Sequence, residues 1–239
     1  MSSAGVATRE SCLQQKRPAA PALITHPELA TLMLRFIYRC LQRVIVVERV
    51  CVLSASTQVF IEKMQPTNQA KRLSHSSLQG FILQEDAPYC EPLLDKITDP
   101  ELCCVGVVQE GRLKSFAWFH VGAAKADMNY GKDARTATAL SLPLDAAFVF
   151  HAYTAAAARG NRLMTQVLSE AAEMLHREQN IQHLVTTTEW TNSSARIAFR
   201  NAGFNEEWFY WRCVLGPWNF GVYPQPRDPI LGFTTPENS

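Results

Sequence analysis

The chain has 239 residues, of which 47% are hydrophobic and 19% charged, with 23 basic against 22 acidic side chains. This apolar content is enough for a sizeable packed core and excludes a wholly disordered chain. No run reaches the roughly 18 apolar residues that a membrane span requires, so we expect no transmembrane segment. The formal charge of +1 gives no overall attraction to nucleic acid, and no nucleic-acid partner is expected.

The seven cysteines follow no metal-binding or disulfide pattern. They form no CxxC pair and no spacing typical of a zinc site, and most lie in apolar runs, where cysteine behaves as a small buried hydrophobe. We therefore expect free thiols, no metal and a cytoplasmic protein. The cysteines are Cys12, Cys40, Cys51, Cys90, Cys103, Cys104 and Cys213.

The N-terminal part divides into a leader and a basic helix. Residues 1–26 are rich in Ser, Ala, Gln and Pro, carry no signal-peptide pattern, and are predicted to be a disordered leader. Apolar side chains then recur at helical spacing over residues 29–43, with Arg35, Arg39 and Arg43 on the other side. Two interpretations stay open: the helix packs on the domain, which we favour, or it docks on a membrane surface or a partner.

Residues 44–97 are predicted to mix strand, loop and helix. A β-branched run predicts a strand over residues 44–53, and residues 54–80 are expected to be a loop or a weak helix. Residues 80–84 are predicted to form a short strand. Residues 88–97 are predicted to form a helix, which ends before an Asp-Pro pair.

A hairpin is indicated next. Apolar runs at residues 102–108 and 113–121 flank the turn-like residues 109–112, and residues 122–141 are expected to be a loop. Residues 146–153 are almost continuously apolar, which is typical of a central strand buried on both faces. The remaining expected elements are a helix over residues 163–178, a strand over 183–188, a helix over 192–201, a strand over 208–215 and an irregular, proline-rich tail over 216–239.

Three strands followed by strand–helix alternation predict a mixed sheet of the α/β or α+β class. The central strand stops at Thr154, and a glycine-containing loop opens directly into the next helix. Such a junction leaves several backbone N–H groups free at the positive end of the helix dipole, where they can bind phosphate. Arg159 and Arg162 add positive charge there.

The short helix that follows the next strand carries a second pattern. Asn192, Ala195 and Phe199 fall on one helix face, and Gly203 is suited to a left-handed C-cap before Phe204. The two patterns occupy successive strand–helix units. Their combination is therefore more specific for one protein family than either pattern alone.

With these two patterns, residues 80–215 resemble the GCN5-related N-acetyltransferase (GNAT) superfamily. The segment from Arg159 to Met164 lies where that family has its R/Q-x-x-G-x-G/A loop, and Asn192 to Phe204 follows its N-x-x-A-x-x-x-Y-x-x-x-G-F motif. The resemblance implies a GNAT-type acyl-CoA N-acyltransferase fold, with a central mixed twisted sheet flanked by helices. The N-terminal basic helix, a strand and a loop at residues 27–79 would precede this domain.

The resemblance implies transfer of an acetyl group from acetyl-CoA, or of another acyl group from its CoA ester, to the primary amine of a small molecule. The amine would attack the thioester directly, with a backbone N–H near Tyr153 or Thr154 polarising the carbonyl. The cofactor-binding candidates are Tyr153, Thr154, Arg159, Gly160, Asn161, Arg162, Leu163, Met164, Asn192 and Phe199.

The chain departs from the family pattern at three positions. Arg162 and Met164 replace two loop glycines, and Phe199 stands where many relatives have a tyrosine that protonates the departing thiolate. Solvent, Tyr153 or Tyr210 would then supply that proton. His151 is a candidate base, and the alternative is a hydrogen-bonded histidine within the packed sheet. Glu189 is a second candidate base, and the alternative is a solvated carboxylate at a strand end. Four tryptophans are expected in the core rather than in an acceptor pocket: Trp118, Trp190, Trp208 and Trp211.

Two alternatives and one open question remain. The donor could be a long-chain acyl-CoA or an acyl carrier protein docked by the basic helix at residues 29–43. The lost glycines and Phe199 also suit a catalytically degenerate protein that binds a ligand without turnover. The sequence leaves open whether the chain is a monomer or a homodimer.

Overall fold

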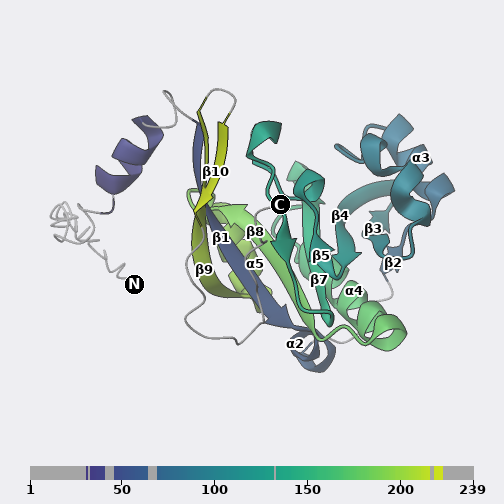
Figure 1. The fold of residues 1–239 in the computed structure, drawn as a ribbon. Helices are drawn as coiled ribbons and strands as arrows, with labels where there is room; N and C mark the ends of the chain where they lie inside the picture. Colours follow the sequence, from purple (N-terminus) through teal and green to yellow (C-terminus); the bar gives the residue numbers. More distant parts are fainter. Residues whose placement is uncertain are drawn as a thin grey trace, which may run out of the picture. The chain divides into compact units, whose positions relative to one another are not determined.

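A computed structural model gives the fold (Figure 1). It describes residues 31, 33–40, 46–63, 69–131, 133–215 and 218–222. The chain divides into two compact units, residues 1–38 and 39–239. The described positions of the expected N-terminal helix are helical. The predicted leader lies outside the described residues.

The second unit is built on an eight-stranded sheet in the order β10-β9-β1-β8-β7-β4-β3-β2. Within the described residues, β7 and β8 form the parallel pair, and the other recorded pairs are antiparallel. The strands are β1 (Val46–Ser56), β2 (Ala70–Arg72), β3 (Leu102–Gln109), β4 (Arg112–Val121), β7 (Ala146–Thr154), β8 (His183–Glu189), β9 (Asn205–Leu215) and β10 (Trp218–Val222). The mixed sheet expected from the sequence is therefore confirmed.

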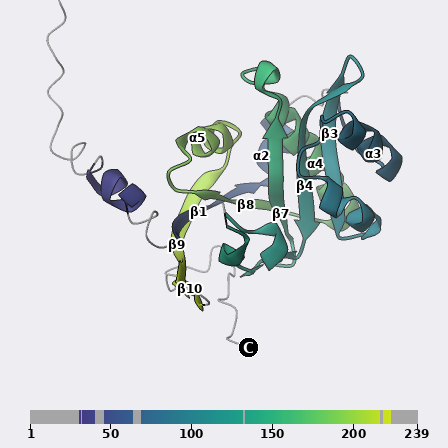
Figure 2. The same ribbon diagram turned by 90° about the horizontal axis from the view of Figure 1, so that it is seen from above.

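Helices cover both faces of this sheet (Figures 1 and 2). One core joins the sheet to α2 (Thr57–Lys63), α4 (Leu163–Gln179) and α5 (Ser193–Asn201). The other core lies under α3 (His75–Leu83) and a series of short elements. These are the 3₁₀ turns η1 (Glu91–Leu93), η2 (Asp95–Thr98), η3 (Ala126–Met128) and η4 (Ala134–Thr136), and the small strands β5 (Ala123–Ala124) and β6 (Leu140–Ser141). We call the two sides the α4 face and the α3 face.

The central strand β7 shows why this architecture forms. Its residues Ala146–Phe150 are all buried. Ala147 and Val149 enter the α4-face core, whereas Phe148 and Phe150 enter the α3-face core, as the two-residue period of a strand requires. A strand buried on both faces needs apolar residues at every position, which is the pattern that identified it in the sequence.

Several local predictions were wrong. Residues 54–80 contain the end of β1, α2, β2 and the start of α3, and the strand predicted at residues 80–84 belongs to α3. The helix predicted over residues 88–97 is replaced by η1 and η2. Residues 218–222 form β10 instead of an irregular tail. These short elements are decided by contacts with the sheet, which local sequence does not encode.

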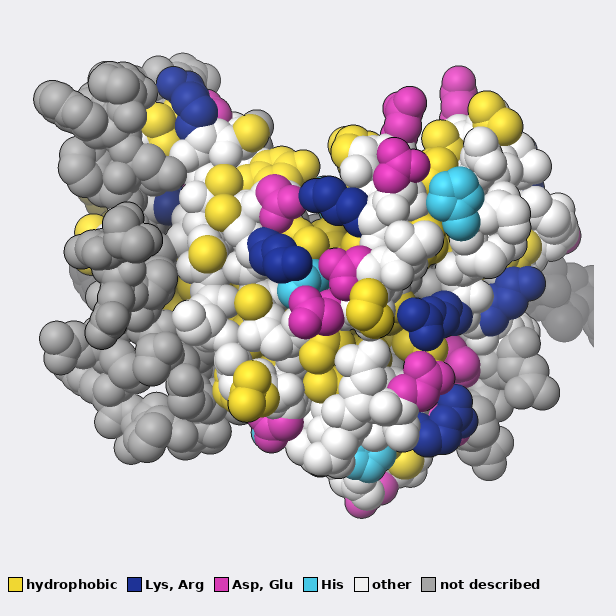
Figure 3. Space-filling model, turned by 45° about the vertical axis from the view of Figure 1, so that its right-hand side comes forward, with side chains coloured by type: hydrophobic (Ala, Val, Ile, Leu, Met, Phe, Trp, Pro, Cys, Tyr) yellow, Lys and Arg dark blue, Asp and Glu magenta, His cyan; other side chains and the backbone are white. Residues whose placement is uncertain are grey.

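Strands from before and after residue 80 form this one sheet, because β1, which precedes residue 80, lies between β9 and β8. No helix of the described part is both long and apolar enough to cross a membrane. Figure 3 shows one face of the molecule, on which basic and acidic side chains are interspersed without a broad patch of one sign.

Candidate functional site

The parallel strands β7 and β8 separate halfway along their length. They pair from Ala146 with His183 as far as Val149 with Thr186, and no pairing between them is recorded beyond that point. From there β7 stays paired with β4 up to Thr154, and β8 stays paired with β1 up to Glu189. The backbone N–H and C=O groups that would continue the ladder therefore face an opening between the two strands.

A β-bulge in β7 marks this separation. Phe116 of β4 pairs with Tyr153 and Trp118 with Phe150, so the single residue between them on β4 faces two residues on β7. One of those two, His151, has a left-handed backbone with φ of 46°. Bulges bend a strand and re-aim its side chains. Here the bulge turns β7 away from β8 and places the His151 imidazole at the start of the opening.

The imidazole of His151 is surrounded by aromatic rings. Phe150 lies 5.2 Å away between ring centroids, Tyr89 stacks at 6.2 Å, and Tyr130 meets it edge-on at 6.2 Å. Within the described residues, the ring makes these aromatic contacts and no recorded hydrogen bond. Burial lowers the pKa of His151, so the imidazole is neutral at neutral pH. The hydrogen-bonded histidine that the sequence allowed as an alternative is not what the structure shows.

Glu189 lies on the other side of the opening. Along β8, Val185 enters the α3-face core, so the strand period places Thr187 and Glu189 on that same face. The Glu189 carboxylate accepts a hydrogen bond from the Thr191 hydroxyl at 2.8 Å. Both candidate bases therefore flank the opening, but the Glu189 carboxylate already has a partner.

The loop after β7 ends in an α4 N-terminus with free donors. Arg162 is the N-cap of α4, and its side chain makes no capping hydrogen bond. Within residues 133–215, which are described without a gap, no acceptor is recorded for the first four N–H groups of this helix, those of Arg162 to Thr165. Four such N–H groups at the positive end of a 17-residue helix are suited to bind an anion.

The two glycine replacements in this loop preserve its backbone. Arg162 has φ of 56°, the left-handed conformation that glycine adopts readily. Met164 packs its side chain against the α4-face core and is therefore directed into the protein. Neither replacement closes the loop. Gly160 keeps a left-handed φ of 85° and has open space beside it.

The remaining candidates of this loop lie close by. The guanidinium of Arg159 donates to the carbonyl of Thr154 at 3.3 Å, which ties the loop to the strand end. The Thr154 hydroxyl shares a hydrogen bond with the Ser115 hydroxyl at 2.9 Å. Tyr153 packs against Phe116 at 5.6 Å between ring centroids. Asn161 and Leu163 complete the segment between the strand and the first turn of α4.

The second motif has a structural role that the structure shows directly. Asn192 caps α5, because its side chain accepts from the N–H of Ala195 at 3.1 Å. Phe199 is 8% exposed and meets Phe204 edge-on at 5.1 Å in the α4-face core. Gly203 ends the helix region with φ of 106°, as expected. Asn192 thus caps α5, and Phe199 acts as a core side chain.

Tyr210 is a poor candidate for the acid. It is fully buried, and its hydroxyl shares hydrogen bonds with the Asn129 side chain. Trp118 is also fully buried, as expected for a core residue, and Trp208 packs partly into the α3-face core. The rings of Trp190 and Trp211 instead lie beside the Arg49 guanidinium, at 4.8 and 5.6 Å from their centroids.

Sequence reasoning missed Tyr89 and Tyr130. Tyr89 follows α3 and is 72% exposed, and Tyr130 lies between η3 and η4 and is 41% exposed. Neither stands in a motif. An aromatic residue in a loop gives no signal of which side chain it will meet, so only the tertiary structure shows that both contact His151. Tyr130 does fall within residues 122–141, a segment expected to be a loop.

Solved GNAT acetyltransferases are among the structural neighbours of this chain. A putative GNAT-family acetyltransferase from Novosphingobium aromaticivorans matches at a TM-score of 0.43 and 15% identity, over 70% of this chain and 64% of its own. An aminoglycoside 6'-N-acetyltransferase from Acinetobacter haemolyticus matches at 0.42 and 12%, over 57% and 90%. The aminoglycoside N-acetyltransferase AAC(6')-Iy in complex with CoA matches at 0.41 and 11%, over 57% and 91%.

The present chain spans less than two thirds of the first of these proteins. No protein-family model matches the sequence, and no curated protein matches it. At these identities, the likeness concerns the fold, and the activities of those proteins are not carried over to this chain.

Proposed function

We propose that this protein is an acyl-CoA-dependent N-acyltransferase that acetylates the primary amine of a small molecule. The observation that carries this proposal is the separation of β7 and β8 beside the free first turn of α4. A nucleotide-linked thioester has phosphate groups, which a helix N-terminus can bind. It also has an extended acyl-bearing arm, which the opening between the two strands would bind. The motifs around Arg159 and Asn192 agree with this function.

The α4 N-terminus supplies the binding site for the pyrophosphate of CoA. The N–H groups of residues 162–165 would donate to its oxygens, and the exposed Arg159 and Arg162 side chains add positive charge. The open space beside Gly160 lets a ligand approach the backbone. The unpaired edge of β7 would bind the extended donor arm as a further strand is bound.

The proposed chemistry is a direct transfer. The amine nitrogen attacks the thioester carbonyl carbon, the carbon–sulfur bond breaks, and its electron pair leaves with the thiolate. The amine proton passes to a base. Because the His151 ring is neutral and has no recorded hydrogen-bond partner within the described residues, we assign this role to His151 rather than to Glu189. Phe199 has no proton to give, so solvent or Tyr153 would protonate the thiolate.

A second candidate function has one observation in its favour. Phe199 is a buried core residue, and Tyr210 is buried and hydrogen-bonded, so neither can serve as the acid. A protein of this fold that binds an acyl-CoA without turnover would have the same features. A long-chain acyl-CoA donor is a further alternative that the same experiment tests, and an acyl carrier protein as donor is another.

The test is a binding titration followed by a turnover assay. The full chain is titrated with acetyl-CoA, desulfo-CoA and a long-chain acyl-CoA, and its melting temperature is recorded. Ligand at 100 times its dissociation constant stabilises the native state by about 2.7 kcal/mol, which is easily measured. Thiol release with a panel of amines then follows. Binding with release supports the proposal, and binding without release against the whole panel supports the second candidate.

Matched charge reversals locate the binding site. Arg162→Glu places a negative charge at the start of α4, whereas Arg177→Glu makes the same change near its end. We expect the first variant to weaken acetyl-CoA binding at least tenfold and the second to leave it within about twofold, because the helix field acts only over its terminal turn. Equal effects of the two variants would contradict the assigned site.

A further inference from the structure

A buried histidine lies near the end of β4. His120 is 1% exposed, and both of its ring nitrogens are buried without a hydrogen-bond partner within the described residues. An unpartnered polar group in the interior is costly, so a native structure that keeps one usually has a reason for it. His120 is not part of the proposed acyl site. It pairs with Phe148, three residues before His151 on β7.

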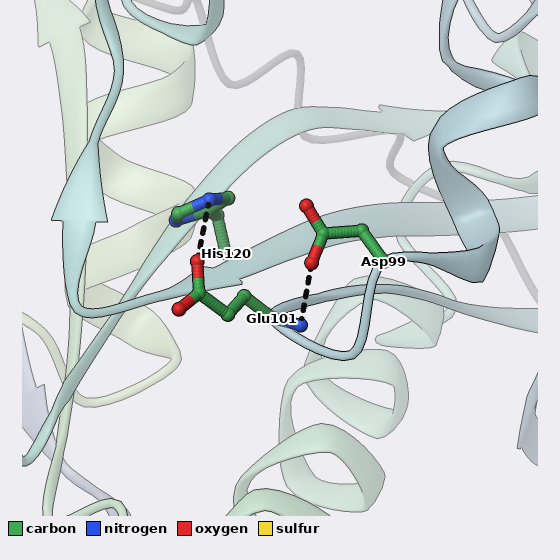
Figure 4. Close-up of side chains that lie close together, drawn as sticks. All are labelled: Asp99, Glu101 and His120. Carbon is green, nitrogen blue, oxygen red and sulfur yellow. Dashed lines mark hydrogen bonds and ion pairs between the residues drawn. The ribbon is translucent and has the colours of Figure 1, made fainter.

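Two carboxylates lie beside this ring (Figure 4). The Nε2 atom of His120 is 3.7 Å from Oε2 of Glu101. Asp99 accepts a hydrogen bond from the N–H of Glu101 through Oδ1 at 2.9 Å, which shapes the turn before β3. One ligand atom from each of the three residues lies within 4.8 Å of the other two.

The backbone holds these three residues together. The N–H of Val121, which follows His120, donates to the carbonyl of Glu101 at 2.9 Å. The N–H of Leu102 donates to the carbonyl of Asp99 at 3.0 Å. The start of β3 and the end of β4 are therefore fixed to each other independently of the side chains, and the backbone of the three residues belongs to one rigid corner of the sheet.

We propose that Asp99, Glu101 and His120 bind one divalent transition-metal ion, with Zn²⁺ the best match, and that water completes its coordination. Zn²⁺ binds imidazole nitrogen and carboxylate oxygen at about 2.0–2.2 Å, so two ligand atoms on one tetrahedral ion are roughly 3.4 Å apart. The separation of 3.7 Å between His120 and Glu101 is close to this value. Glu101 has a 59% exposed side chain, which can move the small distance that remains.

The charges at this corner favour a cation. Asp99 and Glu101 contribute two carboxylates, against the one nearby ammonium group of Lys125. The corner therefore has a net negative charge.

The ion would have a structural role. It would join the turn between η2 and β3 to the end of β4. This corner lies near the N-terminal end of β7, whereas α4 begins after the C-terminal end of β7. No metal was expected from the sequence, because the cysteine spacings match no metal site. Asp99, Glu101 and His120 form no local motif, and only the pairing of β3 with β4 brings them together.

The experiment is a metal titration of the untagged full chain after treatment with a chelator. We expect one Zn²⁺ per chain by calorimetry and a higher melting temperature with Zn²⁺, but no comparable effect of Mg²⁺ or Ca²⁺, which prefer all-oxygen sites. Asp99→Asn and Glu101→Gln alter partly or fully exposed side chains and should each weaken Zn²⁺ binding at least tenfold. Glu110→Gln, at the turn of the same hairpin, is the matched control and should bind like the parent.

Cobalt substitution separates this site from binding to cysteine. We expect a Co²⁺ complex with nitrogen and oxygen ligands, whose spectrum lacks a thiolate charge-transfer band. A thiolate band would assign the ion to a cysteine and overturn the proposal. The proposal also fails if Zn²⁺ leaves the melting temperature unchanged, or if Asp99→Asn and Glu101→Gln bind Zn²⁺ as tightly as Glu110→Gln. None of these readouts depends on acyl transfer.

Discussion

Arg212 of β9 and Glu48 of β1 form a buried ion pair, with Nε of Arg212 donating to Oε2 of Glu48 at 2.7 Å. Each residue is 3% exposed. Arg212 also donates to the carbonyl of Asn129 at 2.9 Å, and the Asn129 side chain accepts from the Thr187 hydroxyl at 2.8 Å. This network holds the loop that carries Tyr130 against the part of β8 that has separated from β7.

The ion pair can be tested with a double-mutant cycle. Arg212→Met removes the guanidinium that donates to the Glu48 carboxylate, and Glu48→Met removes the carboxylate that accepts from Arg212. We expect each single change to cost about 3–5 kcal/mol of unfolding free energy, because removing one partner of a buried ion pair is strongly unfavourable. The double variant should cost clearly less than the sum. Urea unfolding measures all four proteins, and strictly additive losses would show that the two charges do not interact.

Gly131 is required by the same network. A Cβ atom at this position would overlap the Glu48 carboxylate. Gly131→Ala should therefore lower the melting temperature and displace the ion pair. Gly80→Ala is the control, because Gly80 lies within α3 with open space beside it. That change should stabilise the protein by up to about 1 kcal/mol, since alanine is the better helix former. A Gly131→Ala protein as stable as the parent would contradict the packing described here.

His151 is expected to act as the base in acyl transfer. His151→Gln keeps a polar side chain of similar size but cannot take up a proton, and should lower turnover at least about 100-fold. Glu189→Gln should have a much smaller effect, because the Glu189 carboxylate is already bonded to Thr191. Steady-state kinetics with the best amine of the panel measure both. A larger loss in Glu189→Gln would move the role to that residue.

The pH dependence of His151 follows from its lowered pKa. The neutral form is the base, so kcat/KM should rise with pH through a value below the ordinary pKa of 6.5 of histidine and then level off.

The unfolding free energy should also rise with pH, because the pKa of His151 is lower in the folded chain than in the unfolded chain. The unfolded chain binds the proton more readily, so unfolding free energy is lost as pH falls from about 6.5 toward the folded-state pKa. His151→Gln should remove this part of the loss, which urea unfolding at several pH values detects.

Glycine usually destabilises a helix relative to alanine, and we expect the opposite order at Arg162, whose backbone is left-handed. A left-handed φ costs a residue with a side chain about 1 kcal/mol relative to glycine, although the greater unfolded-state freedom of glycine partly offsets the gain. Arg162→Gly should therefore be at least as stable as Arg162→Ala. Within α4 the order should invert, with Arg177→Ala more stable than Arg177→Gly by about 1 kcal/mol. The same order at both positions would indicate that Arg162 is not left-handed in solution.

The buried cysteines should resist alkylation. Burial raises the pKa of Cys51 and Cys103 to about 12 and that of Cys90 to about 11, and it also raises that of Cys104. A thiol reacts as its thiolate, so these groups should stay unlabelled until the protein unfolds. In a Cys12→Ser background, native iodoacetamide labelling should reach the exposed Cys40 first. Rapid labelling of any of the four buried thiols would contradict their packing.

The sequence by itself determined the elements whose patterns are strong and local. The apolar run of β7 and the β3–β4 hairpin were predicted with bounds close to those observed, as were the helical periodicity of α4 and the cap of α5. The free N–H groups at the start of α4 were also predicted, because a helix start after a buried strand leaves these groups without intrahelical partners whatever the rest of the fold does.

The tertiary structure alone decided what meets across the sheet. The bulge at His151 depends on the register of β7 against β4, and the rings of Tyr89 and Tyr130 reach it from separate loops. Likewise, strand pairing brings His120 beside Glu101. Register, burial and the pKa of a side chain are properties of contacts between distant segments, and no local pattern encodes them. The sequence could therefore name candidate residues, but only the folded chain showed which of them share a site.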